Sequence, residues 1–425
     1  MTMFERPHGG ERAILVSVNL VYSSEQNSSE EFTELAGSAG VTVVFKLTTT
    51  RNKPEPRSFI GSGKLQELSE LVLAYKADVV LFNHVLTPGQ ERNLENVLQC
   101  RVLDRTGVIL DIFAQRASSF EGKLQVELAQ LKHLSTRLIK GWTHLERQKG
   151  GIGLRGPGET QLETDRRLIG NRIKSINKRL SKVSQQRKLS RKARQQAQLP
   201  IVSLVGYTNT GKSTLFNYLT QADVLVADQL FATLDSKLRR LVLPNKIRLI
   251  LADTVGFVQN LPHDLIAAFR ATLEETRQAD LLLHVVDASD PERQLRIEQV
   301  NKVLTDIGVT DVPQILVYNK IDCLPDCSSR CYQVKDRTTV WLSALNGEGI
   351  ENLYELLAKQ LSSGTTHCQV RVPVNAGDLR ATLFKNAVVL QELYADNGDS
   401  LLEIQMATQS FNCLTKADLR LQLVK

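Results

Sequence analysis

A glycine-rich segment that directly follows an apolar run has the residue types and spacing of a phosphate-binding loop. The apolar run is residues 201–205, and the segment reads Gly206-Tyr-Thr-Asn-Thr-Gly211-Lys212-Ser213. Glycines let the backbone wrap around phosphates with its N–H groups facing the anion, a lysine reaches the β- and γ-phosphates, and a serine supplies a Mg²⁺ ligand. The residues expected to contact a nucleoside triphosphate are Gly206, Tyr207, Thr208, Asn209, Thr210, Gly211, Lys212, Ser213 and Thr214.

Two later segments carry groups suited to the metal ion and the γ-phosphate. Asp253 follows the apolar run 247–251 and begins Asp-Thr-Val-Gly, whose glycine lets a backbone N–H approach the γ-phosphate. In the loop 229–235, Thr233 is placed to bind Mg²⁺ only when the γ-phosphate is present. The further nucleotide contacts expected are Phe231, Ala232, Thr233, Asp253, Thr254, Val255 and Gly256. The expected catalytic residues are Lys212, Thr233 and Gly256, and the expected Mg²⁺ ligands are Ser213, Thr233 and Asp253.

A third pair of segments indicates which base the nucleotide carries. The apolar run 315–318 leads into Asn319-Lys-Ile-Asp322. A carboxylate accepts hydrogen bonds from both the ring N–H and the exocyclic amine of guanine, and adenine offers no such pair, so Asp322 favours GTP over ATP. A backbone N–H in the segment 343–345 would complete the pocket at the guanine carbonyl. The expected base contacts are Asn319, Lys320, Asp322, Ser343, Ala344 and Leu345.

One residue of these motifs bears on the rate of hydrolysis, and another on the turn of the phosphate loop. Phe257 follows Gly256, where Ras-like enzymes have a glutamine that orients the attacking water. Because phenylalanine cannot hydrogen-bond that water, we expect slow intrinsic hydrolysis unless a partner completes the site; simple packing of the loop is the alternative. Asn209 stands three residues before Lys212, where an asparagine side chain can stabilise the loop turn.

The elements that must position these groups follow from strand-like runs that alternate with helix-length segments. This alternation over the first hundred or so residues and again from residue 201 to about residue 363 predicts two parallel α/β regions, the second doubly wound. The remaining residues predict a small C-terminal α+β region that ends in a helix. With 425 residues, 42% hydrophobic and 23% charged, the chain has the composition of a modular globular protein. The expected domains are 1–118, 119–198, 199–363 and 364–425.

Between the two α/β regions, two apolar series have the spacing of helices that pack together. Apolar residues recur at steps of three or four over residues 124–145, and a second series over 169–183 has heptad spacing. The segment 150–161 contains five glycines and one proline, which cannot continue either helix. The pattern predicts an antiparallel helical hairpin with a glycine-rich tip at 150–161, and the polar, basic residues 185–198 are expected to form a hinge.

The positive charge of the chain is concentrated in this hairpin. The formal net charge is +7, yet residues 132–198 alone contain 18 Lys and Arg against four acidic residues, which leaves the rest of the chain negative. A basic hairpin with Arg155 in its flexible tip is suited to neutralising the phosphates of an irregular RNA. A solvated helical face is the alternative that charge alone leaves open.

Other patterns point away from membrane, disulfide and metal functions. Apolar runs are too short to span a bilayer, and the six scattered cysteines do not form a disulfide framework, so we expect a cytoplasmic protein without membrane contact. Cys323, Cys327 and Cys331 recur every four residues, but Pro325 interrupts any helix there and a metal site is disfavoured. Residues 151–156 match a dinucleotide fingerprint but follow no strand, so that interpretation is disfavoured too.

Several segments together resemble the HflX family of ribosome-associated GTPases. They are the run 150–167, which reads GGIGLRGPGETQLETDRR, and the segments 114–116, 121–130, 228–235 and 253–257. The resemblance covers nearly the whole chain and is weakest after about residue 364. It implies a translation-factor-related P-loop GTPase that binds the large ribosomal subunit and its ribosomal RNA, is stimulated by the ribosome, and separates stalled or idle ribosomes into subunits.

The resemblance also frames the remaining expectations. In this family the hairpin tip approaches the peptidyl transferase centre. Some relatives are described as binding ATP in the N-terminal region, but we favour a simple helix start for Gly61-Ser-Gly-Lys64. A GTP-regulated RNA-binding adaptor with little catalytic role is the alternative function, because Phe257 stands beside Gly256. In some relatives of this GTPase class an asparagine at the position of Asn209 helps to hold K⁺ beside the phosphates; stabilising the loop turn is the alternative. We expect a monomer that uses GTP, Mg²⁺ and, if Asn209 holds it, K⁺.

Overall fold

The computed structural model groups the chain into two compact units. It describes residues 10–21, 28–141, 157–196, 199–221, 230–231, 233–234, 237–258, 275–309, 312–325, 327–334, 337–362, 365–395, 397–407, 414–415 and 420–424. One unit is Met1–Lys182 with Leu225–Asp235 and Val255–Leu273, and the other is Val183–Val224 with Ser236–Thr254 and Glu274–Lys425. No helix in the described part of the chain is long and apolar enough to cross a membrane. The four-domain division stays a prediction.

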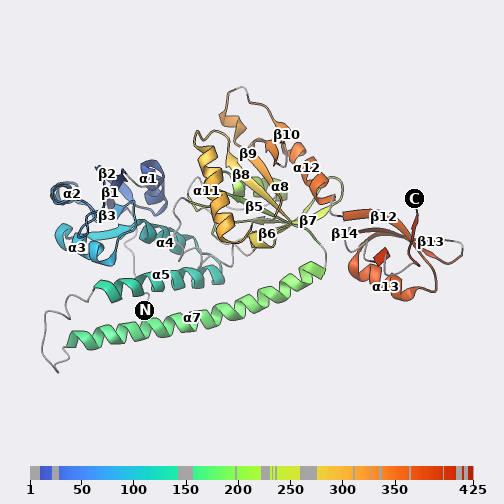
Figure 1. The fold of residues 1–425 in the computed structure, drawn as a ribbon, viewed down its shortest axis with the longest axis horizontal. Helices are drawn as coiled ribbons and strands as arrows, with labels where there is room; N and C mark the ends of the chain where they lie inside the picture. The colour runs from blue at the N-terminus through green and yellow to red at the C-terminus, as the bar shows by residue number, and fades with distance from the viewer. Residues whose placement is uncertain are drawn as a thin grey trace. The chain divides into compact units, whose positions relative to one another are not determined.

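The N-terminal region is a parallel four-stranded sheet covered by helices, as the alternating pattern predicted (Figure 1). The strand order is β2-β1-β3-β4, and every neighbouring pair is parallel. Its elements are β1 (Arg12–Leu20), α1 (Ser29–Ser38), β2 (Thr42–Arg51), α2 (Ser62–Tyr75), β3 (Val79–Phe82), α3 (Pro88–Leu98), β4 (Arg101–Asp104) and α4 (Arg105–Arg116). Gly61 immediately precedes α2, which is the helix start expected there.

Local capping explains where several of these helices begin. The Ser28 hydroxyl accepts a hydrogen bond from the Glu31 N–H at the start of α1, and the Asp104 carboxylate accepts one from Gly107 N at the start of α4. Thr87 and Gln90 form a capping box at α3, which has Pro88 in its first turn. The caps fix where each helix leaves its strand.

Helices α5 (Phe120–Gly141) and α7 (Pro157–Gln196) form the predicted antiparallel hairpin and run side by side in Figure 1. Their directions follow from the contacts: the Arg179 guanidinium lies 5.2 Å from the centre of the Phe120 ring, and Arg172 Nε donates to Glu127 Oε1 over 2.6 Å. Residues that rise along one helix therefore meet residues that fall along the other. The shared seam consists of Leu124, Leu128, Leu131, Ile169 and Ile176.

Two boundaries of the predicted hairpin are wrong. Helix α7 begins at Pro157, so residues 157–161 belong to its first turn and not to the glycine-rich tip, and residues 150–156 lie outside the described part. Proline is favoured in a first helical turn because the N–H it lacks would have had no partner there. The predicted hinge at 185–198 is helical through Gln196, since its Gln, Arg, Lys and Ala residues are good helix formers.

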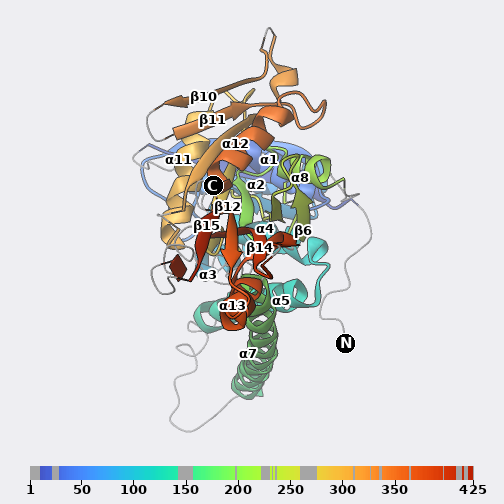
Figure 2. The same cartoon turned by 90° about the vertical axis from the view of Figure 1, so that its right-hand side faces the viewer.

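The second unit contains a seven-stranded mixed sheet in the order β10-β11-β9-β8-β5-β7-β6. The five inner strands are parallel, as predicted, while β6 and β10 are antiparallel edge strands that the sequence analysis missed; Figure 2 shows β10 beside β11. The strands are β5 (Ile201–Gly206), β6 (Lys237–Val242), β7 (Arg248–Asp253), β8 (Leu281–Asp287), β9 (Gln314–Asn319), β10 (Arg330–Val334) and β11 (Arg337–Trp341).

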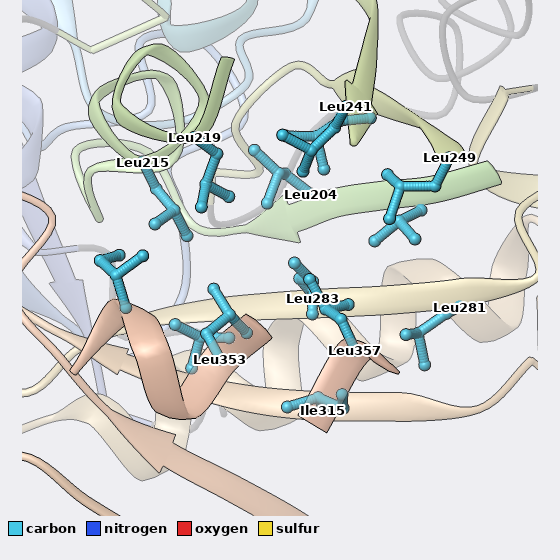
Figure 3. Close-up of a cluster of buried hydrophobic side chains, with 14 of the residues drawn as sticks. Leu204, Leu215, Leu219, Leu241, Leu249, Leu281, Leu283, Ile315, Leu353 and Leu357 are labelled. Atoms are coloured by element: carbon cyan, nitrogen blue, oxygen red, sulfur yellow. The ribbon is translucent and has the colours of Figure 1, made fainter. Parts of the chain in front are cut away.

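Helices on the two faces of this sheet hold its strands in place. Leucines of α8 (Lys212–Thr220) and α12 (Ile350–Ser362) point toward β5, β8 and β9 in one buried cluster (Figure 3). Helix α11 (Arg293–Asp306) buries Ile297, Val300 and Leu304, which are not part of that cluster. Burial on both faces is what near-continuous apolar strands require.

The C-terminal region is a small antiparallel sheet with one packed helix, which agrees with the predicted α+β class. The order is β13-β14-β12-β15, and α13 packs Leu379 and Leu383 on Val370 and Leu402 of the sheet. The elements are β12 (Thr365–Val372), α13 (Gly377–Asn386), β13 (Val388–Tyr394), β14 (Ser400–Ala407) and β15 (Gln422–Val424). The predicted final helix was placed after the last predicted strand without bounds, and residues 408–413 and 416–419 of that stretch lie outside the described part; β15 was not predicted.

Candidate nucleotide site

The loop between β5 and α8 adopts a conformation that only glycine accommodates at two positions. Gly206 has φ +151°, and a Cβ there would lie 2.2 Å from the Val285 carbonyl oxygen. Gly211 has φ +85°, and a Cβ there would lie 2.2 Å from Asn319 Nδ2. Both contacts are far inside van der Waals distance, so the two motif glycines are required by the neighbouring strand and loop as well as by the turn itself.

Lys212 is buried inside this loop with its ammonium group directed at the backbone. Its Nζ donates to the Tyr207 carbonyl oxygen over 2.5 Å, and Thr210 Oγ1 donates to the same oxygen over 3.0 Å. Burial lowers the pKa of Lys212 to about 8, and the charge of Asp253 opposes that shift. A triphosphate in the loop would add negative charge to that of Asp253, and it would raise the pKa of Lys212 again.

A neighbouring histidine adds no competing positive charge. His284 lies on β8 opposite Val205, and burial, followed by the charge of Lys212, lowers the pKa of its imidazole to about 4. The ring is therefore neutral at physiological pH. The Thr208 hydroxyl is also buried and has no hydrogen-bond partner among the described residues, which leaves a donor for a phosphate oxygen.

The two expected Mg²⁺ ligands of the second unit lie within contact of each other. Ser213 Oγ donates to Asp253 Oδ2 over 2.8 Å, and Asp253 is fully buried at the end of β7. The next residue, Thr254, is tied to β5 because its hydroxyl donates to the Leu204 carbonyl over 2.5 Å. A hydroxyl and a carboxylate at the phosphate loop are hard oxygen donors of the kind Mg²⁺ prefers.

The residues expected to read the base form a connected set. Asn319 Nδ2 donates to the Thr210 carbonyl over 2.9 Å, and Asn319 Oδ1 accepts from the Ala344 N–H over 2.8 Å. Ser343 Oγ donates to Asp322 Oδ1 over 2.5 Å. Asn319 therefore joins the phosphate loop to the segment 343–345, and Ser343 fixes one carboxylate oxygen of Asp322. Leu345 is mostly exposed.

Asp287 holds the predicted base contact Lys320 and was not predicted from the sequence. Lys320 has φ +66°, and its Nζ lies 2.7 Å from Asp287 Oδ2, so the Asp287 carboxylate fixes the position of the lysine side chain. Asp287 ends an apolar parallel strand, which is the signal by which it could have been found. Arg296 was missed as well: its guanidinium lies 4.4 Å from the ring centre of Tyr207 and 3.5 Å from Asp290.

The other predicted site residues have mixed positions. Thr214 lies in the first turn of α8, and Asn209 is exposed with φ +59°, a conformation that asparagine tolerates. Thr233 is buried, as is Phe257. Phe231, Thr233, Val255 and Gly256 belong to the first compact unit, whereas Lys212, Ser213 and Asp253 belong to the second; Ala232 lies outside the described part.

The fold and the site together define a class of protein. A phosphate loop follows β5, an aspartate ends β7, and the guanine-type segments follow β9 and β11, so each element stands at the carboxyl end of a parallel strand. Nucleotide loops in this order on a mixed sheet are those of a P-loop GTPase.

Comparison with known proteins gives the family. The chain belongs to the HflX family of GTPases, as the resemblance implied. It is 52% identical to GTPase HflX of Escherichia coli K12 over 98% of both chains, and 45% identical to GTPase HflX of Magnetococcus marinus over 92% of this chain and 91% of the relative.

Family models match four successive parts of the chain. They are described as GTP-binding GTPase N-terminal (residues 26–114), GTP-binding GTPase middle region (116–194), 50S ribosome-binding GTPase (201–320) and HflX C-terminal domain (331–418). Among solved structures, a crystal structure of SsGBP with GDP is similar with a TM-score of 0.47 and 25% identity, covering 83% of this chain and 99% of that one.

Proposed function

We propose that this GTPase binds the large ribosomal subunit in its GTP-bound state and uses the GTP cycle to separate stalled or idle ribosomes into subunits. The similarity of residues 201–320 to a 50S ribosome-binding GTPase supports the choice of partner. The observation that carries the proposal is the charge distribution on α7. Its action on ribosomes would place the protein in the cytoplasm.

Helix α7 separates its apolar and basic residues onto opposite faces. Ile169 and Ile176 are buried in the seam with α5, whereas Lys174, Lys178 and Lys182 are exposed and four residues apart. At 3.6 residues per turn, this spacing gives one stripe that faces away from the seam. An exposed basic stripe on a long rigid helix is suited to RNA phosphates, because each neutralised phosphate releases counterions.

The chemistry assigned to the site divides between its residues. Lys212 would hold the β- and γ-phosphates, and Ser213 and Asp253, joined by Thr233 in the GTP state, would bind Mg²⁺. A bound Mg²⁺ ion would neutralise phosphate charge as the terminal phosphate leaves. The Gly256 N–H would hold the γ-phosphate. The base would be bound by Asp322, which Ser343 orients.

The buried phenylalanine after Gly256 would make the rate of GTP hydrolysis depend on the ribosomal partner. The Phe257 side chain is 3% exposed and carries no group that orients a water molecule. We therefore expect slow turnover alone and stimulation by large subunits. GTP turnover measured with and without purified large subunits tests this: a rate that subunits leave unchanged favours the alternative, a GTP-regulated adaptor with little catalytic role.

Subunit separation is tested by titrating the protein into intact ribosomes and sedimenting the mixture. Arms with GTP, GDP and a non-hydrolysable GTP analogue distinguish binding from hydrolysis as the driving step. We expect free subunits to accumulate with GTP and not with GDP. Intact ribosomes in all three arms would contradict the separating function while leaving subunit binding to be judged from co-sedimentation.

The role of α7 is tested by reversing its basic stripe. The variant Lys174→Glu, Lys178→Glu and Lys182→Glu should weaken co-sedimentation with large subunits and reduce the dependence of log affinity on log salt by about one for each lost phosphate contact. Its matched control reverses three exposed basic residues on other helices, Arg293, Lys302 and Lys359. If both variants bind with the parental affinity and salt slope, the α7 stripe is a solvated face and the RNA contact lies elsewhere.

A further inference from the structure

The segment that carries Thr233 is packed into the same compact unit as the N-terminal sheet. Residues Leu225–Asp235 group with Met1–Lys182 and not with the phosphate loop. Leu230, Phe231 and Leu234 are almost completely buried. A loop that lay in solvent until a nucleotide bound would leave these side chains exposed. Their burial indicates specific contacts with other residues of the same compact unit.

Phe113 and Ser38, at the C-terminal ends of α4 and α1, make two different contacts with this segment, and we call these two residues the Phe231 seat. The Phe231 ring meets the Phe113 ring edge to face, with 4.6 Å between centroids and an angle of 76°. The Leu230 N–H donates to Ser38 Oγ over 3.1 Å, and Ser38 is itself buried. Packing therefore fixes the Phe231 ring, and the hydrogen bond to the Ser38 side chain fixes the direction of the Leu230 N–H.

The helix ends that form the seat are also tied to each other. Gln115 Nε2, near the end of α4, donates to the Ala39 carbonyl just after α1 over 2.9 Å. The backbone of Phe231 has φ +58°, a conformation that a bulky residue adopts only where its surroundings hold it. The two helix ends are therefore fixed to each other, and their contacts hold Phe231 in this backbone conformation.

This anchor limits where Thr233 can go. Thr233 lies two residues after Phe231, and an extended chain spans at most about 3.6 Å per residue, so the Thr233 Cα stays within roughly 7 Å of the Phe231 Cα. Any position that Thr233 takes on binding Mg²⁺ must be reached within that radius, or the Phe231 ring must leave Phe113. If Thr233 binds Mg²⁺ in the GTP state, the position of the Phe231 seat therefore affects the free energy of GTP binding.

We propose that Phe113 and Ser38 are positioning residues of the GTP site, which hold Leu230 and Phe231 so that Thr233 is pre-ordered as a Mg²⁺ ligand for GTP. The inference rests on the role proposed above for Thr233. GDP lacks the γ-phosphate, so Thr233 is not a ligand in the GDP state and the seat does not affect GDP affinity. Linkage also makes the effect reciprocal: a partner that shifts α1 or α4 changes the preference for GTP over GDP.

The test compares the affinities of a non-hydrolysable GTP analogue and of GDP, each with Mg²⁺ and with a chelator. Phe113→Leu keeps an apolar side chain of similar volume but removes the aromatic contact, and Ser38→Ala removes the acceptor for Leu230. In Mg²⁺ we expect each to weaken the GTP analogue about tenfold, the factor for ordering roughly one more residue, with GDP affinity unchanged. The loss should disappear in chelator. Phe82→Leu, in the buried core around β3, is the matched control and should change neither affinity.

Thr233→Ala separates failure of this inference from failure of the proposed site. It should weaken the GTP analogue in Mg²⁺ by itself, and adding Phe113→Leu should then have little further effect, because both act through one ligand. If Thr233→Ala weakens the analogue while Phe113→Leu and Ser38→Ala do not, the seat has no positioning role. If Thr233→Ala has no effect, the assigned ligand is wrong and this inference falls with it. Equal losses for GTP and GDP in the seat variants would also overturn it, since they indicate a purely structural contact.

Discussion

Replacing Asp322 by asparagine should move the preference of this GTPase from guanine toward xanthine nucleotides. Ser343 donates to Asp322 Oδ1 over 2.5 Å, so in the variant the amide oxygen should keep that position and the NH₂ group should take the place of Oδ2. A donor then faces guanine N–H groups, where a carboxylate accepted them. Xanthine has a carbonyl in place of the exocyclic amine and can accept from the new NH₂.

The size of the effect follows from the hydrogen bonds at stake. A hydrogen bond to a charged group contributes about 1.5–3 kcal/mol, and since Asp322 is exposed we take the lower value for two bonds. The sum, about 3 kcal/mol, corresponds to roughly a hundredfold loss of GTP affinity. Xanthosine triphosphate should gain affinity in the same variant, because its carbonyl no longer meets a carboxylate.

Competition between the two triphosphates for the purified protein measures both changes. Glu351→Gln is the matched control, since it removes one exposed negative charge from the first turn of α12 and should leave the ratio of affinities at its parental value. An unchanged ratio in Asp322→Asn would refute the assignment of base recognition to this carboxylate. Loss of both nucleotides with an unfolded spectrum would call for the milder Ser343→Ala, which frees Oδ1 and should weaken GTP and GDP alike.

Three further predictions concern the phosphate loop. Gly211→Ala should abolish nucleotide binding in titrations, because its Cβ would lie 2.2 Å from Asn319 Nδ2 at φ +85°, whereas the control Gly63→Ala, with open space around it, should bind normally. Lys212 has a pKa of about 8, and bound phosphates should raise it, so GTP binding at about pH 8.5 should take up protons. Proton uptake makes the calorimetric binding enthalpy depend on the buffer. This buffer dependence should vanish in Lys212→Met. Turnover with large subunits should be faster in K⁺ than in Na⁺ if Asn209 helps to hold the ion, and equal rates would leave this asparagine a turn residue.

The pH dependence of stability gives Lys212 a second signature with a definite sign. Its folded pKa of about 8 lies below the ordinary lysine value of about 10.4, so between these values the unfolded chain binds more protons than the folded one. The free energy of unfolding should therefore rise as pH increases through that window. Lys212→Met should remove this contribution, and a variant with the parental pH slope would show that the lysine is not buried in solution.

The order of the nucleotide elements was predictable because each signal is local. Residues 201–205 and 281–286 are buried parallel strands whose apolar runs are interrupted only by Ser203 and His284, and the phosphate loop has fixed spacing. The edge strands were not predictable in the same way. β6 and β10 contain Arg239, Arg240 and Arg330, and an edge strand that faces water keeps charged residues and loses the apolar signal.

Long-range contacts of the site could not be predicted from spacing. The hydrogen bond from Asn319 to the Thr210 carbonyl joins residues 109 apart, and the one from Leu230 to Ser38 joins residues 192 apart. Neither segment contains a pattern that names its partner, because the contact exists only after the strands have taken their order. The missed extension of α7 is different: residues 185–196 are polar and basic, which indicated a hinge, but their helix propensity is sufficient to continue the helix.

The grouping of the site residues suggests how GTP and GDP are told apart. Asp322, the proposed base contact, and Lys212, the proposed phosphate contact, belong to one compact unit, and Thr233 and Gly256, the proposed γ-phosphate contacts, belong to the unit of the N-terminal sheet. Substitution of Asp322 should therefore weaken GTP and GDP by similar factors, because both nucleotides carry the same base. Substitutions around the Phe231 seat should change only their ratio, because the energetic difference between the two nucleotides arises where the terminal phosphate is bound. A ribosome that contacts the N-terminal region would then act on this ratio without touching the nucleotide.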